Sequence, residues 1–195
     1  MTMPEKNLGL FGGLFDPVHA GHVRLARIAL SRFNLTRLIV LPAGVPPHKP
    51  RPVLDGEQRL RLLTLAFADM PEAVVDDFEI RKNGTAYTVE TLEHFKKTTG
   101  ATLYFFMGAD NLGEIASWRE PDRILTLARV VAFHRPGYSG LDPFPQYAGR
   151  ILMEPMPPMP MASSEIRRKL KAGEPVGDAL PEAVAEEIRK NGWYQ

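Results

Sequence analysis

Cysteine is absent from this chain of 195 residues. Its absence excludes disulfide bonds, zinc sites with thiolate ligands and catalysis by a thiol nucleophile. It also fits a reducing compartment, so we expect a cytoplasmic protein. We expect no secretory leader, because Met1–Asn7 carry charge and the apolar run that follows is broken by glycines. No run of about 18 apolar residues occurs, so we expect no membrane partner.

An excess of one charge is lacking as well. Lys and Arg total 24 and Asp and Glu total 23, so the overall field does not favour binding to nucleic acid or to an anionic membrane. Any anion must therefore be recognised by a local site. Two common phosphate-binding motifs are also missing, because the first glycines form no Gly-x-Gly-x-x-Gly pattern and no Gly-Lys-Ser/Thr follows them.

Short apolar runs alternate with longer amphipathic stretches, which is typical of a parallel α/β sheet. The predicted strands lie near Leu8–Phe11, Leu38–Leu41, Ala73–Asp76, Thr102–Met107, Arg129–Phe133 and Ile151–Met153. The predicted helices lie near His22–Phe33, Glu57–Met70, Thr88–Lys97, Ser163–Ala172, which Ser163–Glu165 would cap, and Pro181–Lys190. Pro136–Pro160 should be loop with one short strand. The length fits one domain over residues 1–195, with an open, Rossmann-like, mainly parallel sheet, helices on both faces and a small helical region from about residue 163.

One loop carries the strongest chemical signal. The strand Leu8–Phe11 runs into Gly12–Gly13, and the next helix begins near His22, so this loop lies where open α/β sheets bind ligands. Adjacent glycines let backbone amides approach an anion, and the helix N-terminus adds free N–H donors. A single histidine near a helix start is usually a surface or capping residue. His19 and His22 with Gly21 between them instead favour a nucleotide-phosphate site.

The complete pattern, Gly-Gly-x-Phe-Asp-Pro-x-His-x-Gly-His, resembles the His-x-Gly-His signature of the nucleotidyltransferase superfamily. Later blocks narrow the resemblance to bacterial nicotinate-nucleotide adenylyltransferases. These blocks are Pro46-Pro47-His48-Lys49, Ala86-Tyr87-Thr88, Gly108-Ala109-Asp110, Trp118, Arg135-Pro136-Gly137 and Ser163-Ser164-Glu165-Ile166-Arg167. They span nearly the whole chain. The similar phosphopantetheine adenylyltransferases are usually shorter and lack the Trp118 and Tyr87-Thr88 blocks.

The resemblance implies transfer of the adenylyl group of ATP to nicotinate mononucleotide, which gives deamido-NAD and pyrophosphate in NAD biosynthesis. The attacking phosphate is already largely ionised, because its second pKa is about 6, so it needs no general base. Catalysis should then consist of positioning and charge stabilisation. Mg²⁺ is expected to accompany ATP, and no carboxylate cluster predicts protein ligands for a metal.

The resemblance also implies roles for residues on the ATP side. His19, His22, Lys49 and Arg167 are the expected catalytic residues, with Arg167 directed at the pyrophosphate leaving group. Without the resemblance, Lys49 could equally be a solvated lysine beside prolines. Asp110 could accept a ribose hydroxyl, cap the following turn, or do both. The expected ATP-binding set is Gly12, Gly13, Leu14, Phe15, His19, His22, Gly108, Asp110, Ser163, Ser164 and Arg167.

For the acceptor, the resemblance implies that Trp118 stacks on the pyridine ring and that Thr88, with backbone near Arg119, holds the pyridine carboxylate. A tryptophan is more often a core residue, but polar neighbours disfavour full burial here. The expected acceptor-binding set is Thr88, Tyr87, Trp118, Arg119, Arg135 and Lys49. The expected partners are thus ATP and nicotinate mononucleotide, and the sequence leaves open whether the protein forms a homo-oligomer.

Three positions depart from the family pattern. Leu14 stands in place of the usual Thr or Ser, Ala162 in place of the first Ser of the late motif, and Ala43–Gly44 where an Asn is often found. Backbone amides remain at these positions, so we expect activity to be retained. The alternatives are transfer to another phosphorylated acceptor such as phosphopantetheine, which Trp118 and Thr88 disfavour, and a non-catalytic nucleotide-binding regulator, which the two retained histidines disfavour.

Overall fold

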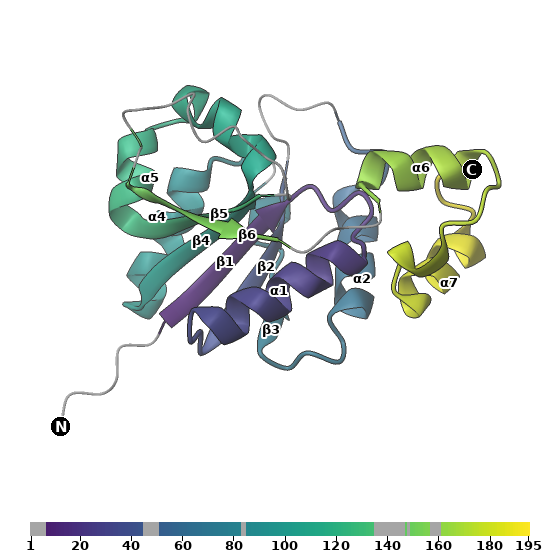
Figure 1. Cartoon of the computed structure of the whole chain (residues 1–195), viewed down its shortest axis with the longest axis horizontal. Coiled ribbons are helices and arrows are strands. Elements are labelled where there is room, and N and C mark those ends of the chain that lie inside the picture. The colour runs from purple at the N-terminus through teal and green to yellow at the C-terminus, as the bar shows by residue number, and fades with distance from the viewer. Residues whose placement is uncertain (1–6, 45–50, 83–84, 135–146, 148, 157–160) are drawn as a thin grey trace.

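The computed structural model describes residues 7–44, 51–82, 85–134, 147, 149–156 and 161–195, apart from the side chain of Asp110. Six strands form one sheet in the order β3-β2-β1-β4-β5-β6, and every neighbouring pair runs parallel (Figure 1). The strands are β1 (Asn7–Gly13), β2 (Arg37–Pro42), β3 (Ala73–Val75), β4 (Thr102–Gly108), β5 (Ala128–His134) and β6 (Ile151–Pro155). The predicted open, parallel, Rossmann-like sheet is therefore confirmed, with small shifts at the strand ends.

The predicted helices are present wherever a helix is long enough for its repeat of apolar residues to show in the sequence. They are α1 (Ala20–Arg32), α2 (Gly56–Ala66), α3 (Phe78–Arg81), α4 (Thr88–Thr99), α5 (Pro121–Leu127), α6 (Ser163–Lys171) and α7 (Glu182–Asn191), with 3₁₀ helices η1 (Ala109–Ser117) and η3 (Gly177–Ala179). The sequence does not predict α3 or α5, because each is too short to establish a period, or η1 and η3, which have a different repeat. Helix α2 also ends earlier than expected.

Two helix starts differ from the prediction. Ala162, which has an extended backbone, is the N-cap of α6, so Ser163 is the first helical residue rather than a cap. The Ser163 hydroxyl instead donates to the carbonyl of Pro17 at 3.0 Å. Gly108 is the N-cap of η1, so Asp110 lies inside that helix and does not cap it. In both cases the cap has no side-chain hydroxyl or carboxylate, and the sequence therefore gives no signal for it.

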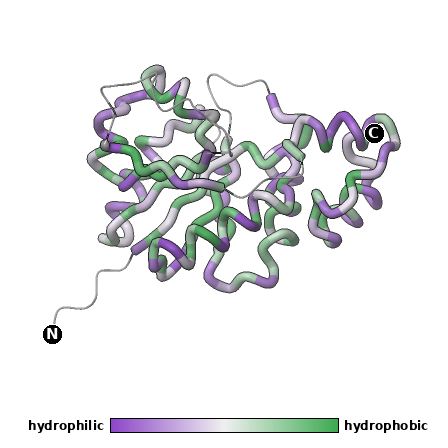
Figure 2. Tube along the Cα trace, in the orientation of Figure 1, coloured by the Kyte–Doolittle hydropathy of each residue, from purple (hydrophilic) through white to green (hydrophobic). Residues whose placement is uncertain are grey.

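Helices cover both faces of the sheet, as predicted. Successive strand residues point to opposite faces, and Phe105 and Phe106 accordingly lie in two different hydrophobic cores. The core around Phe106 contains residues of α1, α2 and α7, whereas the core around Phe105 contains residues of α4, η1 and α5. Figure 2 shows hydrophobic residues gathered in the central strands. The sheet is thus buried on both sides, and ligands can reach it mainly at its edges and strand ends.

The strand order reverses direction between β1 and β4, which are neighbours in the sheet but far apart in the chain. The connections from these two strands leave toward opposite faces, so a crevice opens at their carboxyl ends. Gly12 and Gly13 end β1, and Gly108 ends β4. The fold therefore puts the predicted glycine-histidine loop beside the Gly108–Asp110 block.

The C-terminal helices pack against the α1 and α2 side of the molecule (Figure 1). Val184 and Ile188 of α7 are buried in the core that α1 and α2 share. Tyr194, near the C-terminus, is also buried and reaches the loop after β1. Within the described part of the chain, no helix is both long enough and apolar enough to span a membrane.

Candidate active site

Two cavities flank the end of β1. The first, of about 280 Å³, is called here the histidine cavity and brings together most of the residues expected at ATP: Gly12, Gly13, Leu14, Phe15, His19, His22, Gly108, Ser163 and Arg167. The second, of about 340 Å³, is called here the tryptophan cavity and contains Tyr87, Thr88, Trp118 and Arg119 from the expected acceptor set. Gly12, Gly13, Leu14 and Asn111 line both. Two ligands could therefore approach each other across this shared wall.

The two histidines lie at the start of α1, with His19 as the N-cap and His22 in the first turn. The backbone N–H of His19 donates to Nδ1 of His22 at 3.2 Å, and the rings stack with centroids 3.7 Å apart. The Phe15 and His22 rings meet edge to face, with their centroids 4.9 Å apart. Burial, and then the nearby His19 ring, hold the pKa of His22 well below its ordinary value. His22 is thus a neutral imidazole whose Nε2 carries the hydrogen.

Arg167 extends from the first turns of α6 into the wall of the histidine cavity. Its Nη1 donates to the backbone carbonyl of Asp16 at 2.6 Å, and its side chain is about one-third exposed (34%). Ser163, on the same helix, holds the next carbonyl of the loop, that of Pro17. Helix α6 therefore contributes a positive charge to the cavity and also fixes the loop that surrounds it.

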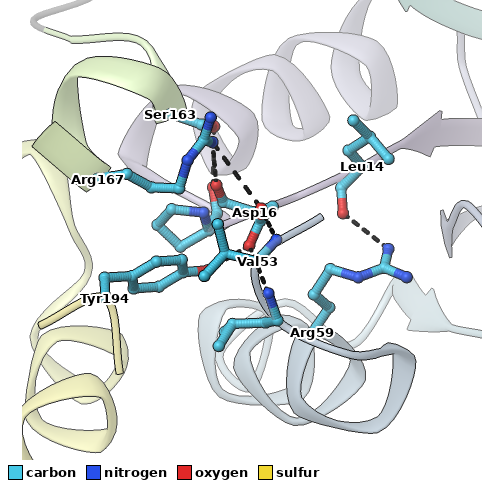
Figure 3. Close-up of polar contacts among 9 residues, drawn as sticks. Leu14, Asp16, Val53, Arg59, Ser163, Arg167 and Tyr194 are labelled. Carbon is cyan, nitrogen blue, oxygen red and sulfur yellow. Dashed lines mark hydrogen bonds and ion pairs between the residues drawn. The ribbon is translucent and has the colours of Figure 1, made fainter. Parts of the chain in front are cut away.

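Helix α2 fixes the loop from the other side. The guanidinium of Arg59 is buried, and its Nη1 donates to the carbonyl of Leu14 at 2.9 Å (Figure 3). Burial lowers the pKa of Arg59, and the nearby Asp16 carboxylate opposes that effect. Because the C=O and N–H of a trans peptide point in opposite directions, holding the Leu14 carbonyl also fixes the direction of the Phe15 N–H. Side chains thus hold the carbonyls of Leu14, Asp16 and Pro17, and the first and last of these contacts fix the direction of the N–H groups that follow them.

The tryptophan cavity lies against the other core. Trp118 follows η1 and is half-buried, with its ring packed edge-on against Phe105 at 6.2 Å between centroids. It packs against the core on one side and lines the cavity on the other, and its stacking on a pyridine ring stays a prediction. The Arg119 guanidinium lies 4.8 Å above the Tyr87 ring and donates to Glu90 at 2.9 Å. These contacts hold Arg119 at the rim of the cavity.

Some predicted site residues are not brought to the cavities by the described structure. Lys49 and Arg135 lie outside the described residues, as does the side chain of Asp110. Ser164 is exposed, and it is not among the residues that line either cavity. Its neighbour Ser163 does line the histidine cavity, but its hydroxyl hydrogen is donated to Pro17. The serine block therefore acts on the loop through one hydroxyl.

Several residues at the site have no role in the sequence-based prediction. Asn111 lines both cavities and donates to the carbonyl of Gly108 at 3.3 Å. Glu79 lines the tryptophan cavity and accepts a hydrogen bond from the Thr91 hydroxyl at 2.8 Å. Burial raises the pKa of Glu79, although its hydrogen bonds oppose the shift. Asn111 directly follows a motif residue and could have been suspected, whereas nothing in the sequence marks Glu79.

The described residues contain no group of three or more His, Asp or Glu side chains that could hold a metal ion. The charged and polar groups that line the histidine cavity include the imidazoles of His19 and His22 and the guanidinium of Arg167, and the cavity lies at the start of α1. The first N–H groups of a helix lack intrahelical partners and lie at its positive end. Asp16 is the one carboxylate that lines the described part of this cavity, and its oxygens accept hydrogen bonds from Val53, Leu54 and Tyr194. The cavity is therefore suited to a phosphorylated ligand.

Comparison with known proteins agrees with this geometry. The family model described as cytidylyltransferase-like matches residues 10–169. A probable nicotinate-nucleotide adenylyltransferase of Clostridium tetani is 36% identical over 97% of this chain and 100% of its own length. The protein of the same name from Escherichia coli O157:H7 is 34% identical over 95% and 97%. The chain belongs to the nicotinate-nucleotide adenylyltransferase family. It is accordingly a nucleotidyltransferase.

Solved structures with the same fold include a member from Plasmodium falciparum, nicotinic acid mononucleotide adenylyltransferase complexed with NaAD. It has a TM-score of 0.81, a sequence identity of 19%, and coverage of 97% of both chains. A second structure of that protein, complexed with APC, has a TM-score of 0.77. These likenesses establish the Rossmann-like fold of the family over nearly the whole chain.

Proposed function

We propose that this protein transfers the adenylyl group of ATP to nicotinate mononucleotide. A phosphate oxygen of the mononucleotide attacks the α-phosphorus of ATP, and the bond from that phosphorus to the bridging oxygen of the β-phosphate breaks. The products are deamido-NAD and pyrophosphate. The observation that carries the proposal is the meeting of two cavities at Gly12–Leu14, one lined by histidines and the other by a tryptophan. The family to which the chain belongs supports the same reaction.

We assign the triphosphate of ATP to the histidine cavity. The first amides of α1 and the Nε2–H of His22 are donors for phosphate oxygens. Arg167 adds a full positive charge, which suits the pyrophosphate as it leaves. Lys49 is proposed as a further cation on this side, and Asp110 as an acceptor for a ribose hydroxyl.

We assign the pyridine ring of the acceptor to the tryptophan cavity. Trp118 offers an aromatic face, and a pyridinium ring is a cation that such a face attracts. Thr88 is the first residue of α4, so its backbone N–H lies at the positive end of that helix. This is a suitable position for the pyridine carboxylate. Arg119 adds positive charge at the rim, and Arg135 is proposed to bind the acceptor as well.

The reaction needs no protein nucleophile and no general base. The attacking phosphate carries nearly two negative charges at neutral pH, because its second pKa is about 6. Catalysis therefore rests on alignment and on donors that stabilise charge at the α-phosphate and the leaving group. We propose that ATP enters as its Mg²⁺ complex, in which the ion neutralises part of the triphosphate charge. EDTA is expected to abolish turnover, and added Mg²⁺ to restore it.

Pyrophosphate release tests the function directly. It is measured with ATP and Mg²⁺ and, in parallel reactions, with nicotinate mononucleotide, nicotinamide mononucleotide or phosphopantetheine as acceptor. We expect release with nicotinate mononucleotide and formation of deamido-NAD. No release with that acceptor from folded protein that binds ATP would contradict the proposal, and release with phosphopantetheine alone would redirect it to another acceptor.

The proposal requires only small-molecule partners. The cytoplasmic location and the lack of nucleic-acid and membrane partners stay predictions, and the oligomeric state stays open. Gel filtration with light scattering would test the oligomeric state.

A further inference from the structure

The carboxylate of Asp16, at the wall of the histidine cavity, joins three distant segments of the chain (Figure 3). It is 5% exposed and accepts hydrogen bonds from the backbone amides of Val53 at 2.8 Å and Leu54 at 3.3 Å. The Tyr194 hydroxyl donates to its Oδ1 at 2.6 Å. A hydroxyl donating to an ionised carboxylate at this distance makes a strong, charge-assisted hydrogen bond. The penultimate residue of the chain is therefore tied to the loop after β1.

Tyr194 lies near the active site, but not in it. The residue is 8% exposed, its ring packs in the core of α1, α2 and α7, and it lines neither cavity. Burial, followed by the hydrogen bond to Asp16, raises the pKa of the Tyr194 hydroxyl far above its ordinary value, so this group remains a donor. Any effect of Tyr194 on the reaction must therefore pass through the residue it holds.

Asp16 in turn contacts Arg167. The Nη1 of Arg167 donates to the Asp16 carbonyl at 2.6 Å and lies 3.9 Å from the carboxylate Oδ2. One end of the guanidinium is thus fixed on Asp16, while the side chain contributes to the wall of the histidine cavity. If the Asp16 carboxylate were free to turn, it could form a closer ion pair with Arg167 and draw the guanidinium away from a phosphate ligand.

We propose that Tyr194 is a positioning residue for adenylyl transfer, because its hydroxyl restrains Asp16 and thereby keeps Arg167 directed at the pyrophosphate part of ATP. The inference rests on the proposed function, in which Arg167 binds that group. The C-terminal segment after α7 thus belongs to the catalytic apparatus, although it contacts no substrate. If Tyr194 had only a structural role, loss of its hydroxyl would lower the stability of the protein without a selective effect on Arg167.

Tyr194→Phe tests the proposal, because it removes the hydroxyl and retains the ring. We expect kcat to fall roughly tenfold, as is typical for loss of one hydrogen bond to a charged group, and the KM for nicotinate mononucleotide to stay unchanged. In an Arg167→Ala background the same substitution should change kcat by less than about twofold, since coupled residues are not additive. Tyr104→Phe is the control, because Tyr104 is also buried and its hydroxyl also has a charged partner, accepting a hydrogen bond from Arg129 away from the site.

Binding of inorganic pyrophosphate, measured by calorimetry, tests the role of Tyr194 without any acceptor. The result therefore does not depend on which acceptor the enzyme uses. Tyr194→Phe should weaken that binding, and Tyr104→Phe should not, whichever acceptor the enzyme uses. Asp16→Asn weakens the same hydrogen bond, together with those from Val53 and Leu54, without changing a residue of the C-terminal segment. It should also weaken pyrophosphate binding, and it serves as the test if Tyr194→Phe does not fold. The proposal is overturned if folded Tyr194→Phe keeps normal kcat and pyrophosphate affinity, if its effect is equally large in the Arg167→Ala background, or if Asp16→Asn binds pyrophosphate normally.

Discussion

The backbone N–H of His19 donates to Nδ1 of His22, and this contact fixes which nitrogen of the His22 ring carries hydrogen. Because Nδ1 accepts, the neutral ring must carry its hydrogen on Nε2. The spacing of three residues in the His-x-Gly-His motif therefore has a local meaning. The first histidine provides a backbone donor that orients the second, and the second can donate to a phosphate without being charged.

His22→Ala should lower kcat by roughly 10²- to 10³-fold, the usual loss when one preorganised donor to a developing charge is removed. His22→Gln should retain more activity than His22→Ala, because the glutamine amide can donate from nearly the same position as Nε2. Steady-state kinetics with ATP and nicotinate mononucleotide measure both effects. A His22→Ala enzyme with near-normal kcat would remove His22 from its proposed role.

The depressed pKa of His22 should make the protein less stable in mild acid. Above the ordinary histidine pKa of about 6.5, the ring is neutral in both the folded and the unfolded chain, so it adds no pH dependence. Below that pH, the unfolded chain binds a proton that the folded chain resists, and the free energy of unfolding decreases. Urea unfolding between pH 7.5 and 5 should show a steeper decline for the wild type than for His22→Gln. Equal slopes would contradict the assigned pKa shift.

Trp118→Ala should raise the KM for nicotinate mononucleotide far more than the KM for ATP, because Trp118 lines only the tryptophan cavity. Trp118→Phe keeps an aromatic face and should give an intermediate value. Trp193→Phe, which alters the other tryptophan outside both cavities, is the control and should leave both KM values unchanged. If Trp118→Ala unfolds the protein, its packing against Phe105 is its main role.

Arg59→Met should reduce the free energy of unfolding by about 1–3 kcal/mol, because the carbonyl of the half-buried Leu14 then loses its charged donor. The loop also becomes free to move, so the KM for ATP should rise. Arg61→Met is the control on the same helix and should cost less, since Arg61 is exposed and its buried partner Glu187 keeps a hydrogen bond from the Asn191 amide. Urea denaturation and ATP kinetics measure both variants, and equal losses for the two would contradict this interpretation of Arg59.

Local sequence patterns were sufficient for most of the fold. The apolar runs from Leu8 to Phe11 and from Thr102 to Met107 are strands, because a strand buried on both faces requires nearly continuous apolar residues. Short elements were missed, since α3 and α5 are too brief for a period to show. The cap of α6 was predicted at Ser163–Glu165 but lies at Ala162, and the Ser163 hydroxyl donates instead to the Pro17 carbonyl in the distant loop.

By itself the sequence determined the parallel α/β fold and the glycine-histidine loop at a strand end, because both depend on residues that are close together in the chain. It also determined the order of motif blocks that indicates the family. Only the tertiary structure decided that Asp16 is held by Tyr194, that Leu14 is held by Arg59, and that Asn111 stands between the two cavities. Each of these contacts or positions joins segments that are far apart in the sequence. Hydrogen bonds of this kind need a particular distance and angle, and no spacing along the chain can provide either.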